Sequence, residues 1–396
     1  MHVLQDIRVV DLTQALAGPY CTMLLGDMGA EVIKVEQPGS GDQSRTWGPP
    51  FVRGESTYFL AVNRNKKSLT LNLKSEQGRE IMHRLVRRAD FFITNLPRQS
   101  SRRDTGVDAV TLLELNPRLV YASITGYGTT GQYAERSGYD LIAQGESGLM
   151  SITGEPQGEP MRYPVPLADM TTGIYATVGV LGALLARQRT GRGQVLDLSL
   201  LESQSAWLGI LASAYLNAGE EPQRVGNIHP NIVPYQVFRA RDKHIIVAVG
   251  TQRLWERFCD VLGVGDGLMK DPRFATNTDR LSHRGELVEL LQNILSQREA
   301  EDWLEALRAA QIPSGPINSV PETLGHAQLT ERGFIVELEH PVAGLVKSLA
   351  NPIHFSETPV NYRLPPPALG EHNAMVLAEL GYTSQEIDGF AARGAI

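Results

Sequence analysis

Strand-like and helix-like segments alternate in the first forty residues, and this order strongly restricts the possible folds. A β-rich run occupies residues 7–12, and a helical segment begins near residues 17–19 and ends at Gly26. A second β-rich run occupies residues 30–36. A strand, a helix and a second strand in this order predict parallel strands joined by a right-handed crossover.

The same alternation continues through the first third of the chain. Residues 69–73 alternate between leucine and polar residues, which predicts a half-buried strand. Residues 75–88 have a helical pattern, and residues 90–95 and 119–124 are expected to be buried strands. The pattern predicts an α/β doubly wound sheet. Because no Gly-x-Gly-x-x-Gly follows the first strand, a dinucleotide site is not supported.

A segment rich in Gly, Pro and Asn at residues 219–234 marks a domain boundary. Beyond it we expect a strand at residues 244–249, then helices, short strands and proline-rich loops. The expected helices lie near residues 251–262, 284–296, 299–310 and 372–380. We therefore predict a smaller domain inserted into a larger one. The predicted parts are residues 1–217 (large domain), 218–320 (small domain with linkers) and 321–396 (return to the large domain).

Composition excludes several classes of protein. The 396-residue chain has a net charge of −7, which argues against a nucleic-acid-binding protein. Its two cysteines, Cys21 and Cys259, are far apart, a pattern typical of a reducing cytosol. We find no signal-peptide pattern at the start, and the apolar stretches at 176–186 and 206–215 are too short or interrupted to span a bilayer. We expect a cytoplasmic protein with no membrane partner.

Asp169 follows a short apolar run, at the point where a long helix is expected to begin. One interpretation is a helix N-cap, because aspartate often accepts backbone N–H groups there. The other is a nucleophile that the positive end of the helix dipole keeps ionised. Spacing alone favours the cap, since caps far outnumber nucleophiles.

Several short blocks distributed over the whole chain together identify a family. They include residues 9–12, 17–19, 29–36, 38–42, 63–69, 116–121, 137–140, 165–175, 190–194, 312–317 and 369–372. Each block is weak alone, but their order and spacing resemble the class III coenzyme A transferases (the formyl-CoA transferase-like, CaiB/BaiF family). This resemblance implies a Rossmann-like large domain, an inserted smaller α+β domain and an interlocked (intertwined-ring) homodimer.

The resemblance places Asp169 on the catalytic aspartate of the family, which reverses the preference for a simple cap. It implies an enzyme without a permanently bound cofactor, for which a coenzyme A thioester is a substrate. Expected coenzyme A contacts are Gln14, Lys66, Lys67, Leu71, Asn95 and Arg103. Arg102 is an alternative to Arg103, because residues 95–106 depart from the family pattern. The alternative for Lys66 and Lys67 is that they lie in a solvated turn and contact no ligand.

A carboxylate nucleophile suits the exchange of a thioester between two acids. The expected cycle passes through an aspartyl anhydride, an aspartyl-CoA thioester and a second anhydride. Water must be excluded, or the anhydride would hydrolyse. By analogy with the mobile glycine loop of the family, residues 226–231 are expected to form a lid, and Gly226, Asn227 and His229 are candidate substrate contacts. Without the resemblance, a domain linker is the simpler interpretation of this segment.

Tyr139 separates two activities within the superfamily. The related α-methylacyl-CoA racemases carry a histidine in the corresponding Gly-His-Asp block, whereas this chain has Gly138-Tyr139-Asp140. A phenol with a pKa near 10 is a poor general base at neutral pH. We therefore expect a transferase, in which Tyr139 lines the substrate pocket. Racemase-like proton transfer and a degenerate coenzyme A-binding scaffold are the alternatives.

The acid substrate is predicted from finer resemblances. Leu16 stands where formyl-CoA:oxalate enzymes carry a glutamine, and the lid lacks their run of four glycines. The chain looks more similar to transferases that use succinyl-CoA and a dicarboxylate, so we expect glutarate, malate or citramalate as acceptor. Oxalate, formate or a carnitine-type acid is the alternative. Candidate partners for the distal carboxylate are Arg45, Arg53, Arg64 and His229.

Overall fold

The chain forms two units in a computed structural model that describes residues 1–396, apart from the side chain of Asp266. The large unit comprises Met1–Met150, Arg162–Glu220 and Gln328–Ile396. The small unit comprises Ser151–Met161 and Glu221–Ala327. The second segment of the large unit begins only at Arg162, so the small unit takes eleven residues that our sequence-based division assigns to the large domain.

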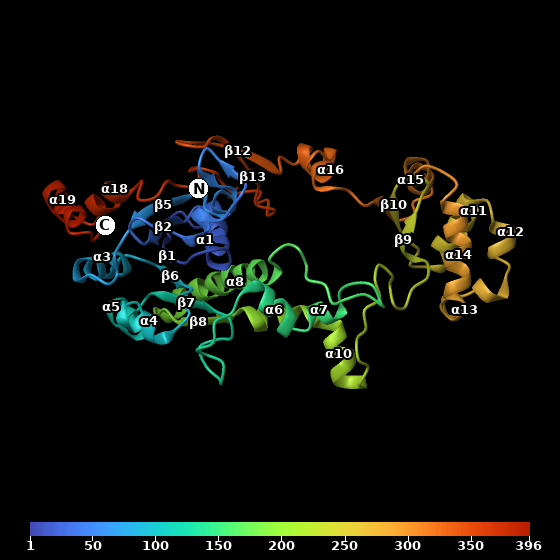
Figure 1. Cartoon of the computed structure of the whole chain (residues 1–396), viewed down its shortest axis with the longest axis horizontal. Helices are drawn as coiled ribbons and strands as arrows, with labels where there is room; N and C mark the ends of the chain where they lie inside the picture. Colours follow the sequence, from blue (N-terminus) through green and yellow to red (C-terminus); the bar gives the residue numbers. More distant parts are fainter. The chain divides into compact units, whose positions relative to one another are not determined.

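A six-stranded sheet organises the large unit (Figure 1). Its strands are β1 (Arg8–Leu12), β2 (Glu31–Glu36), β5 (Lys66–Thr70), β6 (Phe91–Thr94), β7 (Val120–Thr125) and β8 (Val195–Ser199). They lie in the order β5-β2-β1-β6-β7-β8, and every neighbouring pair is parallel. Counted along the sheet, this is the 3-2-1-4-5-6 order of a Rossmann fold. The predicted α/β fold with a parallel central sheet is confirmed.

Helices cover both faces of this sheet, as the buried strands require. Val9 points into a core that includes side chains of α1 (Ala17–Asp27) and α8 (Leu167–Thr190). The next residue, Val10, points into the opposite core, because side chains alternate along a strand. That second core is completed by α3 (Glu76–Arg87), α5 (Ala109–Leu115), α18 (Asn373–Glu379) and α19 (Ser384–Ala392).

Strand β5 begins three residues earlier than the predicted strand at residues 69–73. The alternation of leucines pointed to the later segment, but the sheet instead uses Lys66, which is fully buried. Its ammonium lies 3.1 Å from Asp11 Oδ2 and 2.8 Å from Asn63 Oδ1. A hydropathy pattern cannot anticipate a buried cation whose carboxylate partner lies 55 residues away in sequence.

Helix α8 is longer than the apolar stretch that the sequence suggested, and its length and composition would be sufficient to cross a membrane. The apolar stretch noted at residues 176–186 is part of this longer helix. Half of its most apolar window is buried inside the structure, where the helix packs against α1, α9 (Leu200–Ser205), β7 and β8. These contacts are those of a helix in a protein core.

The other elements of the large unit are shorter. They are η1 (Gln43–Thr46), β3 (Phe51–Val52), β4 (Glu55–Ser56), α2 (Thr57–Val62), α4 (Gln99–Asp104), α6 (Asp140–Glu146), η2 (Ala206–Leu208), α10 (Gly209–Ala218), β12 (Ile335–His340) and β13 (Gly344–Leu349). Helices α7 (Leu149–Ile152) and α17 (Ala327–Glu331) cross the boundaries between the units.

The small unit combines a three-stranded antiparallel sheet with a group of helices. Its strands are β9 (Tyr235–Arg239), β10 (His244–Ala248) and β11 (Ser314–Pro316). Its helices are α11 (Gln252–Leu262), α12 (Gly265–Leu268), η3 (Pro272–Phe274), α13 (Asn277–Ser282), α14 (Arg284–Leu295), α15 (Ala300–Ala309) and α16 (Val320–Leu324). The predicted strand at residues 244–249 and the three predicted helices of this region are confirmed.

Candidate active site

A pocket of about 440 Å³ lies where the large sheet reverses its strand order. Its walls include Gln14 after β1, Asn95 after β6 and Thr125 at the end of β7. Ligands of doubly wound folds bind at this position, because the loops of β1 and its neighbour diverge there and leave a crevice. Asp169, in the first turn of α8, lines the same pocket.

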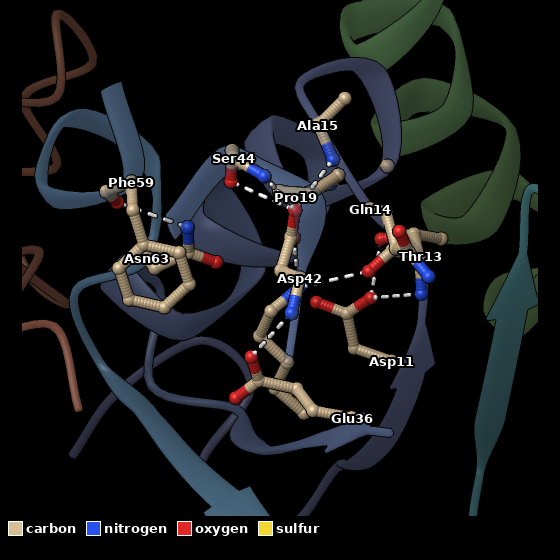
Figure 2. A network of polar contacts seen from close by, with 12 residues as sticks. Asp11, Thr13, Gln14, Ala15, Pro19, Glu36, Asp42, Ser44, Phe59 and Asn63 are labelled. Atoms are coloured by element: carbon tan, nitrogen blue, oxygen red, sulfur yellow. Dashed lines mark hydrogen bonds and ion pairs between the residues drawn. The ribbon is translucent and has the colours of Figure 1, made fainter. Parts of the chain in front are cut away.

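The loop after β1 is held in place by the side chains of Asn95 and Asp42. The Gln14 N–H donates to Asn95 Oδ1 at 3.0 Å, and Asn95 Nδ2 donates to the Gln14 carbonyl at 2.8 Å. Ala15 has a φ of 66°, an unfavourable left-handed conformation for a residue with a side chain. Its N–H donates to Asp42 Oδ1 at 3.1 Å, and Figure 2 shows Asp42 between this loop and β2. A buried ion pair with Lys34 at 2.8 Å anchors Asp42 in turn.

Asp169 does not cap its own helix, so the capping interpretation is wrong. It is the third residue of α8, and the N-cap position is occupied by Pro166, which makes no side-chain cap. The cap comes from another element instead: Asp140 Oδ1 accepts the N–H of Ala168 at 2.8 Å and that of Asp169 at 3.4 Å. Because Asp140 satisfies these N–H groups, the Asp169 carboxylate is left for the pocket.

The electrostatics around Asp169 differ from the expectation of a carboxylate held firmly ionised. Burial, together with the neighbouring Asp140 carboxylate, raises the pKa of Asp169 to about 7. The positive end of α8 favours negative charge, but Asp140 already occupies it. Asp169 is therefore poised to change its protonation state near neutral pH, as is common for catalytic carboxyl groups.

Tyr139 lies at the rim of the pocket and is 64% exposed. It precedes α6 and is carried there by a close contact between two glycines: a Cβ on Gly138 would lie 2.5 Å from the Cα of Gly126. Two backbone segments can approach this closely only where both residues are glycines. An edge-to-face pair, Trp47 and Tyr58 with ring centroids 4.9 Å apart, adds aromatic surface to the pocket.

The structure separates the expected coenzyme A contacts into three groups: residues that line the pocket, buried residues and residues at the surface. Gln14 and Asn95 line the pocket. Lys66 is buried, and its ammonium is bonded to Asp11, Asn63 and the Pro19 carbonyl, so it is not free to contact a phosphate. The side chain of Leu71 is 1% exposed and belongs to the core. The predicted roles of Lys66 and Leu71 do not fit these positions, because burial was not evident from the local sequence.

The remaining basic candidates lie at the surface of the large unit. Lys67 pairs with Glu31 at 2.6 Å and with Glu379 at 3.2 Å, so carboxylates already neutralise much of its charge. Arg103 is exposed on α4, whereas its alternative Arg102 is buried. Exposure therefore favours Arg103 for contact with a ligand.

The expected substrate residues are divided between the two units. Leu16 is buried in a small cluster with Met23 and Val62, against which Tyr58 and Met170 pack, so it supports the pocket wall from behind. Gly226, Asn227 and His229 belong to the small unit. There the His229 ring stacks on Tyr235 with centroids 5.1 Å apart. Their predicted role in a lid remains a prediction.

Two of the arginines proposed for a distal carboxylate are already paired with carboxylates. Arg45 donates to both oxygens of Glu36 at 2.7 and 2.8 Å. Arg64 is buried and donates to both oxygens of Asp27 at 2.9 and 2.6 Å. Arg53 lies in the exposed turn between β3 and β4 and does not line the pocket. The pocket instead contains Arg162, which sequence reasoning missed although it lies only seven residues before Asp169.

Comparisons with known proteins agree with this geometry. The model of CoA-transferase family III matches residues 4–373. The succinate–glutarate CoA-transferase of Agrobacterium fabrum is 44% identical over 95% of this chain and 95% of its own length. The human succinyl-CoA:glutarate CoA-transferase is 39% identical over 99% of this chain and 90% of its own length. The crystal structure of a CaiB/BaiF family protein from Brucella suis superposes with a TM-score of 0.87 at 41% identity, covering 96% of this chain and 99% of that one.

These matches extend over nearly the whole chain, and they confirm the resemblance that the ordered sequence blocks suggested. The Rossmann order of the sheet and a pocket at its reversal point are the features of a ligand-binding doubly wound fold. The chain is therefore an enzyme of the CoA-transferase type and belongs to CoA-transferase family III.

Proposed function

We propose that this enzyme transfers coenzyme A from succinyl-CoA to a C4–C6 dicarboxylic acid, with glutarate as the first candidate acceptor. The observation that carries the mechanism is the position of Asp169 in the pocket at the sheet reversal, with no hydrogen bond to its carboxylate from the residues that the structure describes. The choice of acids rests on the activities for which the Agrobacterium and human relatives are named. Malate and citramalate remain further candidates.

In the proposed cycle, the Asp169 carboxylate attacks the thioester carbonyl of succinyl-CoA, and the coenzyme A thiolate leaves. The thiolate then attacks the aspartyl carbonyl of the resulting anhydride, forming an aspartyl-CoA thioester and releasing succinate. The carboxylate of the acceptor attacks this thioester and again releases the thiolate. The thiolate finally attacks the acceptor carbonyl of the second anhydride, which yields the new acyl-CoA and restores Asp169.

Each of these steps develops negative charge on an oxygen and needs a hydrogen-bond donor nearby. Gln14 is suited to this task, because its Oε1 accepts the Gln43 N–H at 3.4 Å and its Nε2 is left to donate. The Tyr139 hydroxyl at the pocket rim is a second candidate. Gln14 and Asn95 are also the proposed contacts for coenzyme A, with Lys67 and Arg103 as surface candidates. Residues 226–231, with Gly226, Asn227 and His229, are the proposed lid.

A panel of acids assayed with succinyl-CoA tests the proposed specificity. Transfer to glutarate, malate or citramalate is expected to exceed transfer to monocarboxylates of similar length. A strict preference for a monocarboxylate acceptor would contradict it. Exchange of the α-proton of a 2-methylacyl-CoA in deuterated water, without transfer of coenzyme A, would favour the racemase-like alternative.

Asp140→Asn is expected to shift the acid limb of the pH profile to lower pH, because the negative charge of Asp140 adds to the effect of burial in raising the pKa of Asp169. The active form of Asp169 is the carboxylate, so kcat/KM should rise as pH increases through the pKa of about 7. Removing the neighbouring negative charge lowers this pKa. The measurement is kcat/KM for succinyl-CoA between pH 5 and pH 9.

A matched control for this substitution is Asp104→Asn, which removes an exposed carboxylate of α4 that does not line the pocket. The acid limb of the pH profile of this control should coincide with that of the unmodified enzyme. If the Asp140 variant showed the same acid limb as this control, Asp140 would have no influence on the ionisation of the nucleophile.

We also propose that the enzyme is a homodimer of interlocked chains in the cytoplasm. An exposed apolar surface on α8 and α10 supports self-association: Val178 is 61% exposed, Ile210 85% and Leu216 78%. No residue of α10 is buried, although the helix is largely apolar. Large apolar side chains that gather at the surface commonly mark a protein interface.

Ile210→Glu is expected to weaken the dimer, because a charge would then have to be buried in an apolar interface. Light scattering coupled to size-exclusion chromatography should show a shift from a dimer toward the monomer mass of 43.4 kDa. Substitution of the exposed Val110 on α5 by glutamate provides a control outside this surface. A monomeric unmodified protein would contradict the proposed assembly.

A further inference from the structure

The pocket around Asp169 has one cationic side chain among the described residues that line it, and this is Arg162. The same lining contains two carboxylates, those of Asp140 and Asp169. A substrate with a second negative charge would therefore be repelled by these two carboxylates and attracted by Arg162. Two questions follow: whether the charge of Arg162 is already neutralised by another residue, and what holds Arg162 at the pocket.

Arg162 carries an available charge. In the described part of the chain, its guanidinium forms neither an ion pair nor a hydrogen bond, and it is exposed. This distinguishes it from Arg45 and Arg64, whose donors are occupied by Glu36 and Asp27. A guanidinium presents several N–H donors in a planar fork that matches a carboxylate. Arg162 can thus accept an anionic ligand without first breaking an internal contact.

The backbone beside Arg162 is fixed relative to the proposed nucleophile. The N–H of Tyr163 donates to Gln144 Oε1 at 2.8 Å, and Gln144 Nε2 donates to Asp140 Oδ2 at 2.7 Å. Asp140 in turn binds the first N–H groups of α8, the helix that carries Asp169. Gln144, the residue that links these contacts, is almost completely buried. These hydrogen bonds hold the backbone next to Arg162 in place and leave its guanidinium free.

We propose that Arg162 binds the carboxylate of the substrate that does not react, and that it thereby selects dicarboxylic acids. This inference rests on the proposed function, since it identifies the residue behind that specificity. One arginine can serve both halves of the cycle, because the succinyl donor and the acceptor acid are each joined in turn to the same Asp169 carboxylate. A charge-assisted pair of this kind is strong and directional. An acid without the second carboxylate leaves the guanidinium without a partner.

Arg162→Met tests this assignment when glutarate is compared with its monoamide, in which a neutral amide replaces the second carboxylate. The unmodified enzyme is expected to prefer glutarate by about 10- to 100-fold in kcat/KM, the range for a hydrogen-bonded charge pair. The variant should lose this preference, mainly through a higher KM for glutarate. Succinyl-CoA is the donor in both assays. Any effect of the substitution on the reaction with succinyl-CoA therefore cancels when kcat/KM for glutarate is divided by kcat/KM for the monoamide.

Two further variants complete the experiment. Arg87→Met removes an exposed arginine on α3, on the opposite side of the sheet, and should keep the full preference for glutarate. Arg162→Lys keeps the charge without the planar fork and should retain part of the preference. Thermal unfolding of all three variants shows whether the fold is intact, and the exposed position of Arg162 predicts that it is.

The outcomes separate this inference from the proposed function. If the unmodified enzyme prefers glutarate and Arg162→Met preserves that preference, the assignment of Arg162 is overturned and the dicarboxylate function stands. If the unmodified enzyme transfers coenzyme A to no dicarboxylate, the proposed function itself fails. If the preference for glutarate is lost in Arg162→Met but kept in Arg87→Met, both the dicarboxylate function and the role of Arg162 are supported.

Discussion

Asp169→Asn is expected to lower the rate of coenzyme A transfer by about 10⁴-fold or more, the usual scale for loss of a covalent nucleophile. An amide cannot attack a thioester to form the anhydride, so the first step of the cycle is lost. The measurement is the rate of succinyl-CoA consumption in the presence of glutarate. Intact-mass analysis should show an acyl or coenzyme A adduct on the unmodified protein and none on the variant.

Stability measurements distinguish this loss from misfolding. The folded protein raises the pKa of Asp169 to about 7, above the value near 4 of an exposed aspartate. The group therefore stabilises the fold most below pH 4, and this contribution is lost as pH rises toward 7. Asparagine carries no charge, so the variant should be at least as stable as the unmodified protein at pH 8. This advantage should disappear near pH 4.

A suitable control is Asp388→Asn, which changes an exposed carboxylate on α19. It should keep both the activity and the mass adduct. Full activity of the Asp169 variant, or an adduct on another residue, would assign the nucleophile elsewhere.

Arg64→Met is expected to destabilise the protein by about 3–5 kcal/mol, because it leaves the Asp27 carboxylate buried without its cation. Arg64 is 1% exposed and binds both oxygens of Asp27. Its third contact, to the carbonyl of Leu349 at 2.8 Å, holds the C-terminal segment against the first domain segment. The melting temperature should fall by roughly 5–10 °C, given about 2 °C per kcal/mol for a unit of this size.

An exposed ion pair supplies the control for this substitution. Lys347→Met removes the partner of Glu337, and both side chains are more than half exposed. The expected effect is less than about 1 kcal/mol, because exposed pairs are well hydrated when separated. The double variant Asp27→Asn with Arg64→Met should recover part of the stability, since no buried charge is then unpaired. Equal melting temperatures for Arg64→Met and Lys347→Met would contradict the proposed role of the buried pair.

The strand and helix order of the fold was largely predictable from sequence. The segments at residues 7–12, 30–36, 90–95 and 119–124 correspond to strands β1, β2, β6 and β7. Buried parallel strands are continuous apolar runs, so their positions are visible locally. The start of β5 was not predictable, because Lys66 interrupts the apolar pattern and its partner Asp11 lies on another strand.

In the candidate site, too, some features were predictable from the sequence and others depended on the fold. Ordered sequence blocks pointed to Asp169, and position 139 separated transferase from racemase. The sequence did not reveal that Asp140, and not Asp169, caps α8, because both carboxylates lie near possible helix starts. It also suggested Arg45 and Arg64 as substrate partners, whereas the fold pairs both with buried carboxylates.

By itself, the sequence determined the α/β class and the family, and it singled out Asp169 as the proposed nucleophile, because these depend on local periodicity and on the order of short blocks along the chain. The tertiary structure decided which charges are available for chemistry. Asp140 and Asp169 are 29 residues apart, yet their carboxyl groups share one helix end, and burial together with this neighbouring charge raises the pKa of Asp169. Arg162 keeps a free guanidinium because no carboxylate of the described chain lies close enough to pair with it. Desolvation and ion pairing depend on distances in space, and these distances arise only when the chain has folded.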